Sequence, residues 1–496
     1  MTAAGTTLDA LLEGFAAAPR VPVAGLALDG RRLRAGEAFV ALRGRSGHGL
    51  DFVSQAIARG ARAVLWDPAE GAGPGALPGG VAAVAVPALR QRLGEIAARC
   101  FGHPAARLSI AGVTGTNGKT TCAWLLALAS ARLGRDAGYL GTLGCGRPPA
   151  LAETSHTTPD VLALHGALAG LVADGVERAV LEVSSHALDQ DRLAGVPVAV
   201  AAFTNLTRDH LDYHGTLEAY AAAKRRLFEL PGVAHAVINV GDPVGLGFAR
   251  GLPAGVELTA VSVGAGPDIG AARRLRVTNL ATGPGGLVLA IEGDFGVREL
   301  RSPLVGAFNA ENLAVVLGML LAWGHPVDAA LEALAGCGAP PGRMESFRTA
   351  GGALAIVDYA HTPDALAKVL EAARRHAAGR LAVVFGCGGE RDAGKRAPMG
   401  AIAERLADLV YVTDDNPRGE DPQHIVAAIL AGMNSPGRAR VERDRAAAIA
   451  AAVASAGAGD VVVIAGKGHE RVQVIGREAR PFSDRDCLLA LGGVAA

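Results

Sequence analysis

Lysine is scarce in this sequence of 496 residues. Five of the 48 basic residues are lysines, namely Lys119, Lys224, Lys368, Lys395 and Lys467. A genome rich in arginine codons would explain the bias. Each remaining lysine is nevertheless a candidate for chemistry that arginine cannot perform, because a lysine ammonium is compact and can lose its proton, whereas an arginine stays charged.

The sequence also lacks a surplus of either charge. Its 48 basic residues are balanced by 48 acidic ones. A protein that binds nucleic acid without sequence preference normally carries a basic surplus, so we expect no nucleic-acid partner. An anionic substrate would have to be held by a few placed groups.

Cysteines and long apolar runs are few. The six cysteines are scattered and form no C-x-x-C pair, which argues against a disulfide framework and a zinc site. The N-terminus shows no basic-then-apolar signal pattern. Charged residues, glycine or proline interrupt every apolar stretch before 18 residues. We therefore expect a cytoplasmic protein with no membrane insertion.

Apolar residues and glycine, by contrast, are abundant. Half of the residues are hydrophobic and 19% are charged, which excludes a disordered chain. The 67 glycines follow no G-X-Y period, so collagen is excluded and many tight turns are expected. The length suggests three domains, at roughly 150 residues for each.

The order of apolar segments predicts an α/β fold with three domains. Runs such as 179–183 and 198–203 are typical of buried parallel strands. We expect a small α/β N-terminal domain at 1–106, a central doubly wound domain with a mostly parallel sheet at 107–339, and a Rossmann-like α/β C-terminal domain at 340–496. Residues 257–301 are expected to form a β-rich insertion.

A glycine-rich loop at 112–121 joins a predicted strand to a predicted helix. Its glycines let backbone N–H groups face phosphate oxygens, and the helix N-terminus favours an anion. Lys119 would reach the phosphates and the Thr120 hydroxyl would bind Mg²⁺, as in a P-loop ATPase. The strict P-loop pattern requires a glycine where Val113 stands. A plain glycine-rich turn therefore stays open at this point.

Three further polar residues suggest a metal site. Glu182 ends a predicted strand and offers the hard oxygen that Mg²⁺ prefers. His210 follows the next predicted strand, and the carboxyl ends of parallel strands are where α/β sheets bind ligands. Taken alone, His210 also fits a hydrogen-bonded structural histidine, and Lys224 fits an ordinary lysine on a helix surface.

Together these motifs resemble the Mur ligase family, the ATP-dependent amide-bond formers of peptidoglycan synthesis. The family's loop reads G-x-T-G-T-N-G-K-T, which residues 112–120 match. E-V-S-S-H at 182–186, T-N-L-x-x-D-H-L-D-x-H at 204–214, G-x-F-N-x-x-N at 306–312 and D-Y-A-H-x-P at 358–363 also match. The resemblance extends over essentially the whole chain.

The resemblance implies ATP, two Mg²⁺ ions and a CO₂-derived carbamate on Lys224. The implied catalytic residues are Lys119, Glu182, His210 and Lys224, and the implied metal ligands are Thr120, Glu182, His210 and the carbamylated Lys224. The implied ATP-binding residues are Gly115, Thr116, Asn117, Gly118, Lys119, Thr120, Thr121, Asn309, Asn312, Arg343, Asp358 and His361.

A UDP-sugar peptide is the second implied substrate. Its implied binding residues are Gly30, Gly44, Ser46, His48, Thr157, Thr158, Ser184, Gln190 and Arg192. The family usually has D-S-R where this chain has Asp29-Gly30-Arg31. The hydroxyl that contacts the uridine part is therefore missing, and either a backbone N–H replaces it or affinity is lower.

The D-N-P-R signature at 415–418 resembles that of family members that add meso-diaminopimelate. A guanidinium binds a carboxylate bidentately, which suits the extra carboxylate of this amino acid, whereas a lysine substrate would leave Arg418 unpaired. A functionless N-P turn remains the alternative. The implied binding residues are Arg391, Asp415, Asn416, Pro417, Arg418, Gly466 and Glu470.

We therefore expect an ATP-dependent ligase that joins meso-2,6-diaminopimelate to the D-Glu γ-carboxylate of UDP-MurNAc-L-Ala-D-Glu through an acyl phosphate. We expect a monomer whose domains close about a hinge near 340–345. The alternatives are a lysine-adding ligase, an NTP-driven switch such as a P-loop GTPase, and a sugar-nucleotide-binding protein without catalysis. Guanine-specificity motifs are not evident, and the implied catalytic set is complete.

Overall fold

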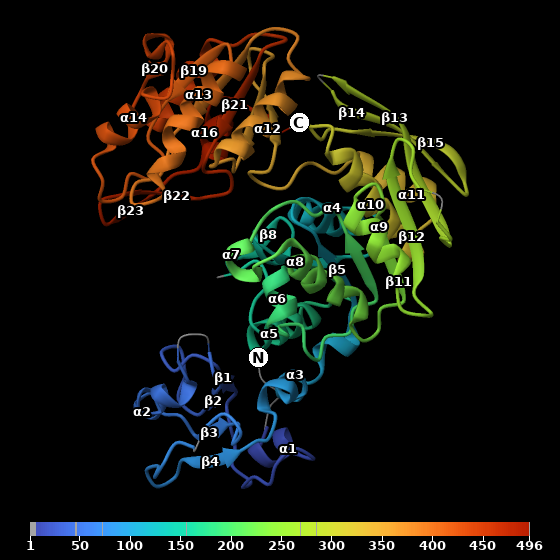
Figure 1. Cartoon of the computed structure of the whole chain (residues 1–496), viewed down its shortest axis with the longest axis vertical. Helices are drawn as coiled ribbons and strands as arrows, with labels where there is room; N and C mark the ends of the chain where they lie inside the picture. Colours follow the sequence, from blue (N-terminus) through green and yellow to red (C-terminus); the bar gives the residue numbers. More distant parts are fainter. Residues whose placement is uncertain are drawn as a thin grey trace. The chain divides into compact units, whose positions relative to one another are not determined.

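The computed structural model describes residues 6–44, 47–71, 73–154, 156–267, 269–283 and 285–495. The chain divides into two compact units. The first consists of Met1–Lys119, Ser130–Ile238 and Asp242–Leu258, and the second of Thr120–Ala129, Asn239–Gly241 and Thr259–Ala496. Figure 1 labels the helices and strands along the chain.

The N-terminal segment forms a small parallel sheet with the strand order β1-β2-β3-β4. Val40 and Leu65 face one hydrophobic cluster, and their neighbours Phe39 and Val64 face another. Such alternation is expected of strands that are covered on both faces. The elements are β1 (Leu26–Ala27), β2 (Ala38–Ala41), β3 (Ala63–Trp66), β4 (Ala82–Ala85), α1 (Leu8–Leu12), α2 (Val53–Ala58) and α3 (Leu89–Cys100).

The central sheet has eleven strands within the described residues, in the order β15-β14-β13-β12-β11-β10-β5-β9-β6-β7-β8. The strands are β5 (Ser109–Thr114), β6 (Ala137–Gly141), β7 (Gly144–Arg147), β8 (Ala150–Ala152), β9 (Arg178–Glu182), β10 (Val200–Phe203), β11 (His235–Asn239), β12 (Glu257–Val263), β13 (Arg273–Gly283), β14 (Gly286–Gly293) and β15 (Gly296–Ser302). The associated helices are α4 (Lys119–Arg132), α5 (Val161–Ala173), α6 (Ser185–Asp189), α7 (Leu211–His214), α8 (Leu217–Arg225), α9 (Pro243–Arg250), α10 (Asn309–Ala322) and α11 (Val327–Ala335).

This sheet is mixed rather than uniformly parallel. Its middle strands β11, β10, β5, β9 and β6 pair in parallel. The series β6-β7-β8 and β13-β14-β15 are antiparallel, as Figure 1 shows for β13, β14 and β15. The expected β-rich insertion is present as β12–β15, and the expected parallel arrangement holds for the strands that position the phosphate loop and also for β12 with β13.

The strand register brings three predicted motifs to one edge of the sheet. Val113 in β5 lies opposite Glu182 in β9, and Thr114 lies opposite Phe203 in β10. Because the three strands are parallel, their carboxyl ends meet at the same edge. The glycine-rich loop after β5, Glu182 and the segment after β10 are therefore neighbours.

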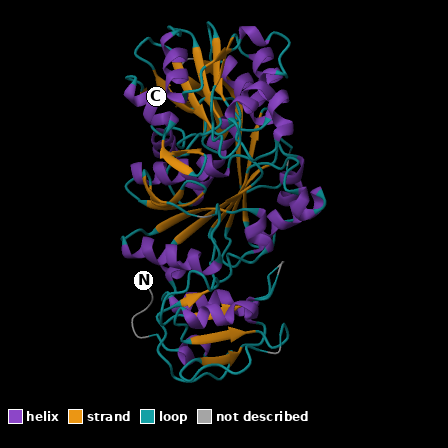
Figure 2. Ribbon diagram, turned by 90° about the vertical axis from the view of Figure 1, so that its left-hand side faces the viewer, coloured by secondary structure: helices purple, strands orange, loops and turns teal. Residues whose placement is uncertain are grey.

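The C-terminal segment forms a third sheet with the order β20-β19-β18-β21-β17-β16-β24. Val383 and Phe385 of β18 pack with helices α12, α13 and α14, whereas Ala382 and Val384 pack with α15 and α16. Figure 2 shows helices on both sides of these strands, as in a Rossmann-like layer arrangement. The elements are β16 (Glu345–Arg348), β17 (Leu354–Asp358), β18 (Leu381–Phe385), β19 (Leu409–Val412), β20 (Arg440–Val441), β21 (Val461–Ala465), β24 (Val494–Ala495), α12 (Pro363–Arg374), α13 (Arg396–Leu406), α14 (Pro422–Leu430), α15 (Arg445–Ala454) and α16 (Asp484–Ala490), with a separate hairpin of β22 (Val472–Ile475) and β23 (Glu478–Pro481).

Among the residues that the structure describes, no helix is both long enough and apolar enough to cross a bilayer.

Candidate active site

The glycine-rich loop is held in place by the segment that follows β10. Gly115 has φ +148°, and a Cβ there would lie 1.9 Å from the Thr204 hydroxyl oxygen, so the position accepts only glycine. The Thr204 hydroxyl donates to the Asn117 carbonyl at 2.6 Å. The Thr116 N–H donates to the Asn205 carbonyl at 2.8 Å, and the Asn117 N–H donates to the Asn205 side chain at 3.0 Å.

Lys119 folds back over this loop. Its ammonium donates to the carbonyls of Gly115 and Thr116, each at 2.9 Å. Gly118, with φ +85°, precedes it, and Thr120 and Thr121 follow in the first turn of α4. Thr120 is buried. A lysine cation on a loop that leads into a helix N-terminus is the arrangement that binds phosphate.

Glu182 is fixed by its neighbours. Its side chain is buried at the end of β9 and accepts from the Thr142 N–H at 2.9 Å, from the Thr142 hydroxyl at 3.2 Å and from the Tyr139 hydroxyl. The Thr142 hydroxyl also contacts that of Thr157 at 3.1 Å. The carboxylate therefore keeps one orientation beside the phosphate loop.

Lys224 is buried, with only 1% of its surface exposed. Its Nζ lies 2.7 Å from the Gly115 carbonyl oxygen and 4.5 Å from the centroid of the Tyr220 ring. Burial, followed by the nearby Lys119 cation, lowers the pKa of Lys224 well below its ordinary value, and Asp209 opposes this shift. A lysine in such surroundings favours its neutral amine.

His210 also lies near Tyr220. The two rings are 6.1 Å apart, and His210 also contacts the His186 ring at 4.9 Å. Its backbone has φ +52°, and its N–H donates to the Asp209 carboxylate at 2.8 Å. The structure therefore brings Lys119, Glu182, His210 and Lys224 to the edge of the sheet where β5, β9 and β10 end.

The other predicted ATP residues belong to the second compact unit. Asn309 starts α10 and donates to the Val305 carbonyl at 2.8 Å, and Asn312 donates to the Asn309 side-chain oxygen at 2.8 Å. Both asparagines are buried. Their mutual bond fixes both amides in one orientation.

Arg343, Asp358 and His361 surround Tyr359. The Asp358 carboxylate is buried and accepts from the N–H groups of Met344 and Ala360, at 2.8 and 2.9 Å. The Arg343 guanidinium lies 5.2 Å from the Tyr359 ring centroid, and the His361 ring contacts the same ring at 4.6 Å. Burial raises the pKa of Asp358, while the Arg343 cation and the two N–H donors oppose the rise.

A cavity of about 620 Å³ lies between the N-terminal sheet and the region after β9, and this volume is typical of ligand sites. The predicted residues Gly44, Gln190 and Arg192 line it, and Arg43 and Arg90 also line it. The lining carries both signs of charge, because Glu70, Asp160, Asp189 and Asp191 line the cavity together with the three arginines.

A chain of hydrogen bonds connects this cavity to Glu182. Arg192 donates to the Gln190 side chain at 2.7 Å and to the Thr158 carbonyl at 2.7 Å. The Thr158 hydroxyl donates to the Glu182 carbonyl at 2.7 Å and to the Ser184 hydroxyl at 3.3 Å. Ser184 in turn caps α6. Thr157, Thr158, Ser184, Gln190 and Arg192 are therefore neighbours, and their contact with the UDP-sugar stays a prediction.

Two predicted uridine-side residues stand apart from these. Gly30 and His48 do not line the cavity within the described residues. His48 caps the turn at Gly49–Phe52 by accepting from the Leu50 N–H at 3.0 Å. A Cβ on Gly30 would meet its nearest neighbour, the Phe52 carbonyl, at 3.5 Å, which is ordinary contact. Ser46 lies outside the described residues.

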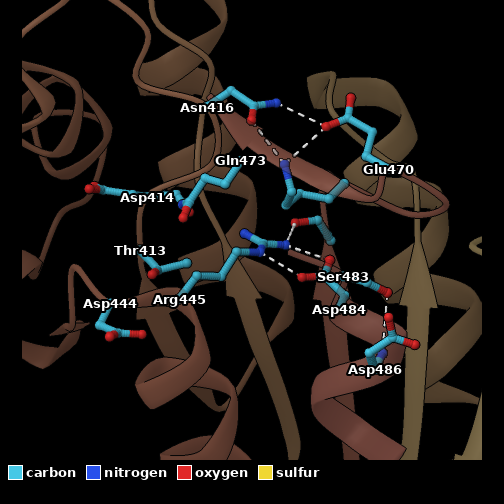
Figure 3. A network of polar contacts seen from close by, with 12 residues as sticks. Thr413, Asp414, Asn416, Asp444, Arg445, Glu470, Gln473, Ser483, Asp484 and Asp486 are labelled. Atoms are coloured by element: carbon cyan, nitrogen blue, oxygen red, sulfur yellow. Dashed lines mark hydrogen bonds and ion pairs between the residues drawn. The ribbon is translucent and has the colours of Figure 1, made fainter. Parts of the chain in front are cut away.

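Two of the predicted amine-site residues, Asn416 and Glu470, belong to a polar network at the carboxyl ends of β19 and β21 (Figure 3). The Asn416 amide donates to Glu470 at 2.9 Å, and Glu470 and the Asn416 oxygen both accept from Lys467, each at 3.0 Å. The buried Arg445 forms a bidentate pair with Asp484, with both contacts at 2.7 Å. Burial raises the pKa of Asp415, although the Arg445 and Lys467 cations oppose the rise.

Arg418 adopts an unusual backbone conformation next to this network. Its φ is +52°, which is rare for a residue with a side chain and recurs at functional sites. Its guanidinium donates to the Gly389 carbonyl at 2.9 Å, close to the exposed Arg391. Pro417 precedes it in the turn. Gly466 has φ +119°, and a Cβ there would lie 2.6 Å from an Asp415 carboxylate oxygen.

Sequence reasoning missed several residues that hold the predicted ones. These are Tyr139 and Thr142 at Glu182, Tyr220 at Lys224, and Lys467 and Arg445 in the amine network. Tyr220 and Lys224 stand four residues apart on α8, a spacing that places both on one helix face and could have indicated the contact. Within the described part of the chain, no group of three or more His, Cys, Asp and Glu is arranged to hold a metal ion.

Comparison with known proteins gives matches over nearly the whole chain. Family models match residues 22–100 ("Mur ligase family, catalytic domain"), 113–320 ("Mur ligase middle domain") and 342–468 ("Mur ligase, glutamate ligase domain"). Together they support the expected three-domain α/β architecture.

Two curated relatives carry the name UDP-N-acetylmuramoyl-L-alanyl-D-glutamate–2,6-diaminopimelate ligase. The one from Alkalilimnicola ehrlichii is 48% identical over 95% of this chain and 95% of its own, and the one from Xylella fastidiosa is 48% identical over 97% and 96%. A solved structure of a ligase with the same name is 37% identical, covers 98% of each chain and has a TM-score of 0.72. The chain therefore belongs to the Mur ligase family.

Proposed function

We propose that this protein is the ATP-dependent ligase that adds meso-2,6-diaminopimelate to the D-Glu γ-carboxylate of UDP-MurNAc-L-Ala-D-Glu in peptidoglycan precursor synthesis. The observation that carries the proposal is the amine-site loop, where Asn416 donates to Glu470 and Arg418 donates to the carbonyl of Gly389, two residues before Arg391. Relatives of this name match the chain at 48% identity over almost its full length.

The proposed reaction has two steps. The γ-carboxylate first attacks ATP, forming an acyl phosphate and ADP. The amine of diaminopimelate then attacks the acyl carbon, forming the amide and releasing phosphate. ATP supplies the activation, so no protein nucleophile is required. The role of Lys119 is electrostatic, because its ammonium, held over the loop by the carbonyls of Gly115 and Thr116, offsets charge on the transferred phosphoryl group.

The residues present suit the expected Mg²⁺ ions and carbamate. Lys224 is buried beside a second cation, and a neutral amine is the form that reacts with CO₂. A carbamate would turn this position into an oxygen donor. Thr120, Glu182, His210 and the carbamylated Lys224 would then hold Mg²⁺, which would supply positive charge to the phosphates. Glu182 is already oriented by Tyr139 and Thr142.

The assignment of substrates to domains is part of the proposal. The 107–339 domain takes ATP through the phosphate loop, with Asn309 and Asn312 on the adenine side. Arg343, Asp358 and His361 of the 340–496 domain are the further proposed contacts of the nucleotide. The 1–106 domain and its border take the UDP-sugar, with Arg43, Arg90 and Arg192 of the mixed-charge cavity as the proposed contacts of its diphosphate. The 340–496 domain takes diaminopimelate. The boundaries, the monomeric state and the hinge near 340–345 remain predictions.

The test is phosphate release from ATP in the presence of UDP-MurNAc-L-Ala-D-Glu, with meso-diaminopimelate or L-lysine as the amine. We expect turnover with diaminopimelate only. Arg418→Ala should raise the KM for diaminopimelate by at least about tenfold, since a bidentate charged contact is lost. Equal use of L-lysine by the unaltered protein would refute the assigned specificity, and phosphate release without any amine would favour a nucleotide-driven switch.

A further inference from the structure

Lys467 is a buried lysine that the proposed reaction has not used. Its side chain is fully buried, and its ammonium lies between two acceptors, the Asn416 side-chain oxygen and Glu470 Oε2, each at 3.0 Å. A buried cation is costly unless it is paired and hydrogen-bonded, and both conditions are met here. In a chain that otherwise prefers arginine, this position retains the compact ammonium.

The backbone around Lys467 directs its side chain inward. Gly466 and Gly468 flank it with φ values of +119° and +52°. A Cβ on Gly466 would lie 2.6 Å from Asp415 Oδ2, and one on Gly468 would lie 2.7 Å from the Tyr359 Cβ. Both positions therefore require glycine, and the turn that they form places Lys467 behind the residues predicted to contact the substrate.

The contacts of Lys467 determine which atoms of its partners remain available. Asn416 Oδ1 accepts from Lys467 and, at 2.9 Å, from the Val474 N–H, which fixes the orientation of the amide. One Nδ2 hydrogen goes to Glu470 Oε2. Among the described residues, the second Nδ2 hydrogen and Glu470 Oε1 have no partner, and Figure 3 shows that oxygen turned away from the network.

The two available atoms have opposite character. The Asn416 N–H is a donor suited to a carboxylate, and Glu470 Oε1 is an acceptor suited to an ammonium group. Together they match one amino-acid head group, in which the two charges sit on one carbon. Each of the two ends of diaminopimelate carries such a group, whereas lysine has only an amine at its distal end.

We infer that Lys467 is a positioning residue for the amino-acid substrate, because it holds Asn416 and Glu470 as a fixed donor–acceptor pair for one zwitterionic end of diaminopimelate. This inference rests on the proposed function. Lys467 itself would not touch the substrate, since both of its observed contacts are to protein side chains.

The test compares Lys467→Met with Lys368→Met in the full-length protein. Lys368 is an exposed lysine paired with Asp364 on the surface of α12, so its loss should leave all constants unchanged. Lys467→Met should raise the KM for meso-diaminopimelate by at least about tenfold, the effect of losing a charged hydrogen bond, with kcat lowered less and the KM values for ATP and the UDP-sugar peptide unchanged.

A second variant and a double-mutant cycle distinguish a positioning role of Lys467 from a general loss of structure. In a Glu470→Gln background, adding Lys467→Met should raise this KM by less than about twofold, because contacting residues are non-additive. If Lys467→Met does not fold, Lys467→Arg provides the test of the positioning role. This variant keeps the charge but should still raise the KM for diaminopimelate. An unchanged KM for diaminopimelate, or equal rises in all three KM values, would overturn the inference.

Turnover by the unaltered protein distinguishes the two proposals. If it does not ligate diaminopimelate, the proposed function fails. If it does and Lys467→Met behaves like Lys368→Met, only the role of Lys467 fails.

Discussion

At the residue scale, the surroundings of a side chain decide its chemistry. Lys224 and Lys368 are both lysines on helices, yet Lys368 forms an exposed ion pair while Lys224 is buried against Gly115 and Tyr220. The sequence singled out Lys224, and the family resemblance predicted its role. It could not supply the lowered pKa, which depends on packing between segments more than a hundred residues apart.

Replacing Lys224 with alanine should lower the ligation rate by at least about hundredfold, the scale of a lost electrostatic group in an active site. Phosphate release measures this loss, and Lys368→Ala serves as the matched control. Full activity of Lys224→Ala in bicarbonate-free buffer would contradict the carbamate.

The carbamate itself should depend on pH in a defined direction. Because the pKa of Lys224 is lowered, its amine is neutral at pH values where an ordinary lysine is charged. In ¹³C-bicarbonate, an NMR signal from a single carbamate should persist well below the ordinary lysine pKa and fade as the pH falls through the lowered one. Its presence in Lys224→Ala would assign it elsewhere.

Gly30 offers a test of the departure from the family pattern. A Cβ at this position meets only ordinary contacts, so Gly30→Ser should change the free energy of unfolding by less than about 0.5 kcal/mol. Its hydroxyl should lower the KM for the UDP-sugar peptide by about two- to tenfold, the value of one neutral hydrogen bond. An unchanged KM would mean that the backbone already makes the contact.

At the element scale, the loops after β18 and β19 are joined by one ion pair. Arg396 donates to both oxygens of Glu420, at 2.6 and 2.7 Å, and the Glu390 N–H donates to the same carboxylate at 3.1 Å. These contacts lower the pKa of Glu420 to about 2. The pair therefore connects the loop of Arg391 to the loop of Arg418.

The stabilisation from Glu420 should depend on pH. A carboxyl group whose folded pKa is below its unfolded value stabilises the fold above the unfolded pKa, near 4.5, and loses that contribution as the pH falls toward about 2. Urea unfolding between pH 3 and 7 should show a smaller loss of stability on acidification for Glu420→Gln than for the unaltered protein. If the stability of both proteins changed with pH in the same way, the ion pair would contribute nothing measurable to the free energy of unfolding.

The elements that the sequence predicted well are those with continuous apolar runs, such as β9, β10 and β18. It placed β13 inside the β-rich insertion without its bounds, because Arg273, Arg274 and Arg276 lie in a strand with an exposed face, and it did not predict the short strands β7 and β8. Pairing with a neighbouring strand stabilises such segments, and this is a tertiary effect that local composition does not reveal.

At the scale of the whole molecule, the proposed UDP-sugar and diaminopimelate sites belong to different compact units. Multidomain proteins commonly unfold in more than one transition, and a ligand stabilises the part that binds it. Scanning calorimetry should therefore resolve two transitions. The UDP-sugar peptide should raise the temperature of one and diaminopimelate that of the other, whereas one transition that both ligands raise equally would contradict separate binding units.

The candidate site was predictable to different degrees in its different parts. Motifs with fixed spacing, such as the phosphate loop, gave candidate contact residues directly. Tyr139, Thr142 and Lys467 were not identified because they act by holding Glu182, Asn416 and Glu470, and such support depends on folding that brings distant segments together. The supporting residues are the part of a site that spacing alone does not reveal.

Because the protein has few lysines, covalent labelling of their amines can report on its local conformation. Of the five, all within the described residues, only Lys368 has an exposed side chain, while Lys224 and Lys467 are buried. An amine-directed acylating reagent should mark Lys368 first in the native state. Delayed acylation of Lys224 or Lys467, followed by mass spectrometry, would report local opening at the phosphate loop and at the amine site separately, with no introduced probe.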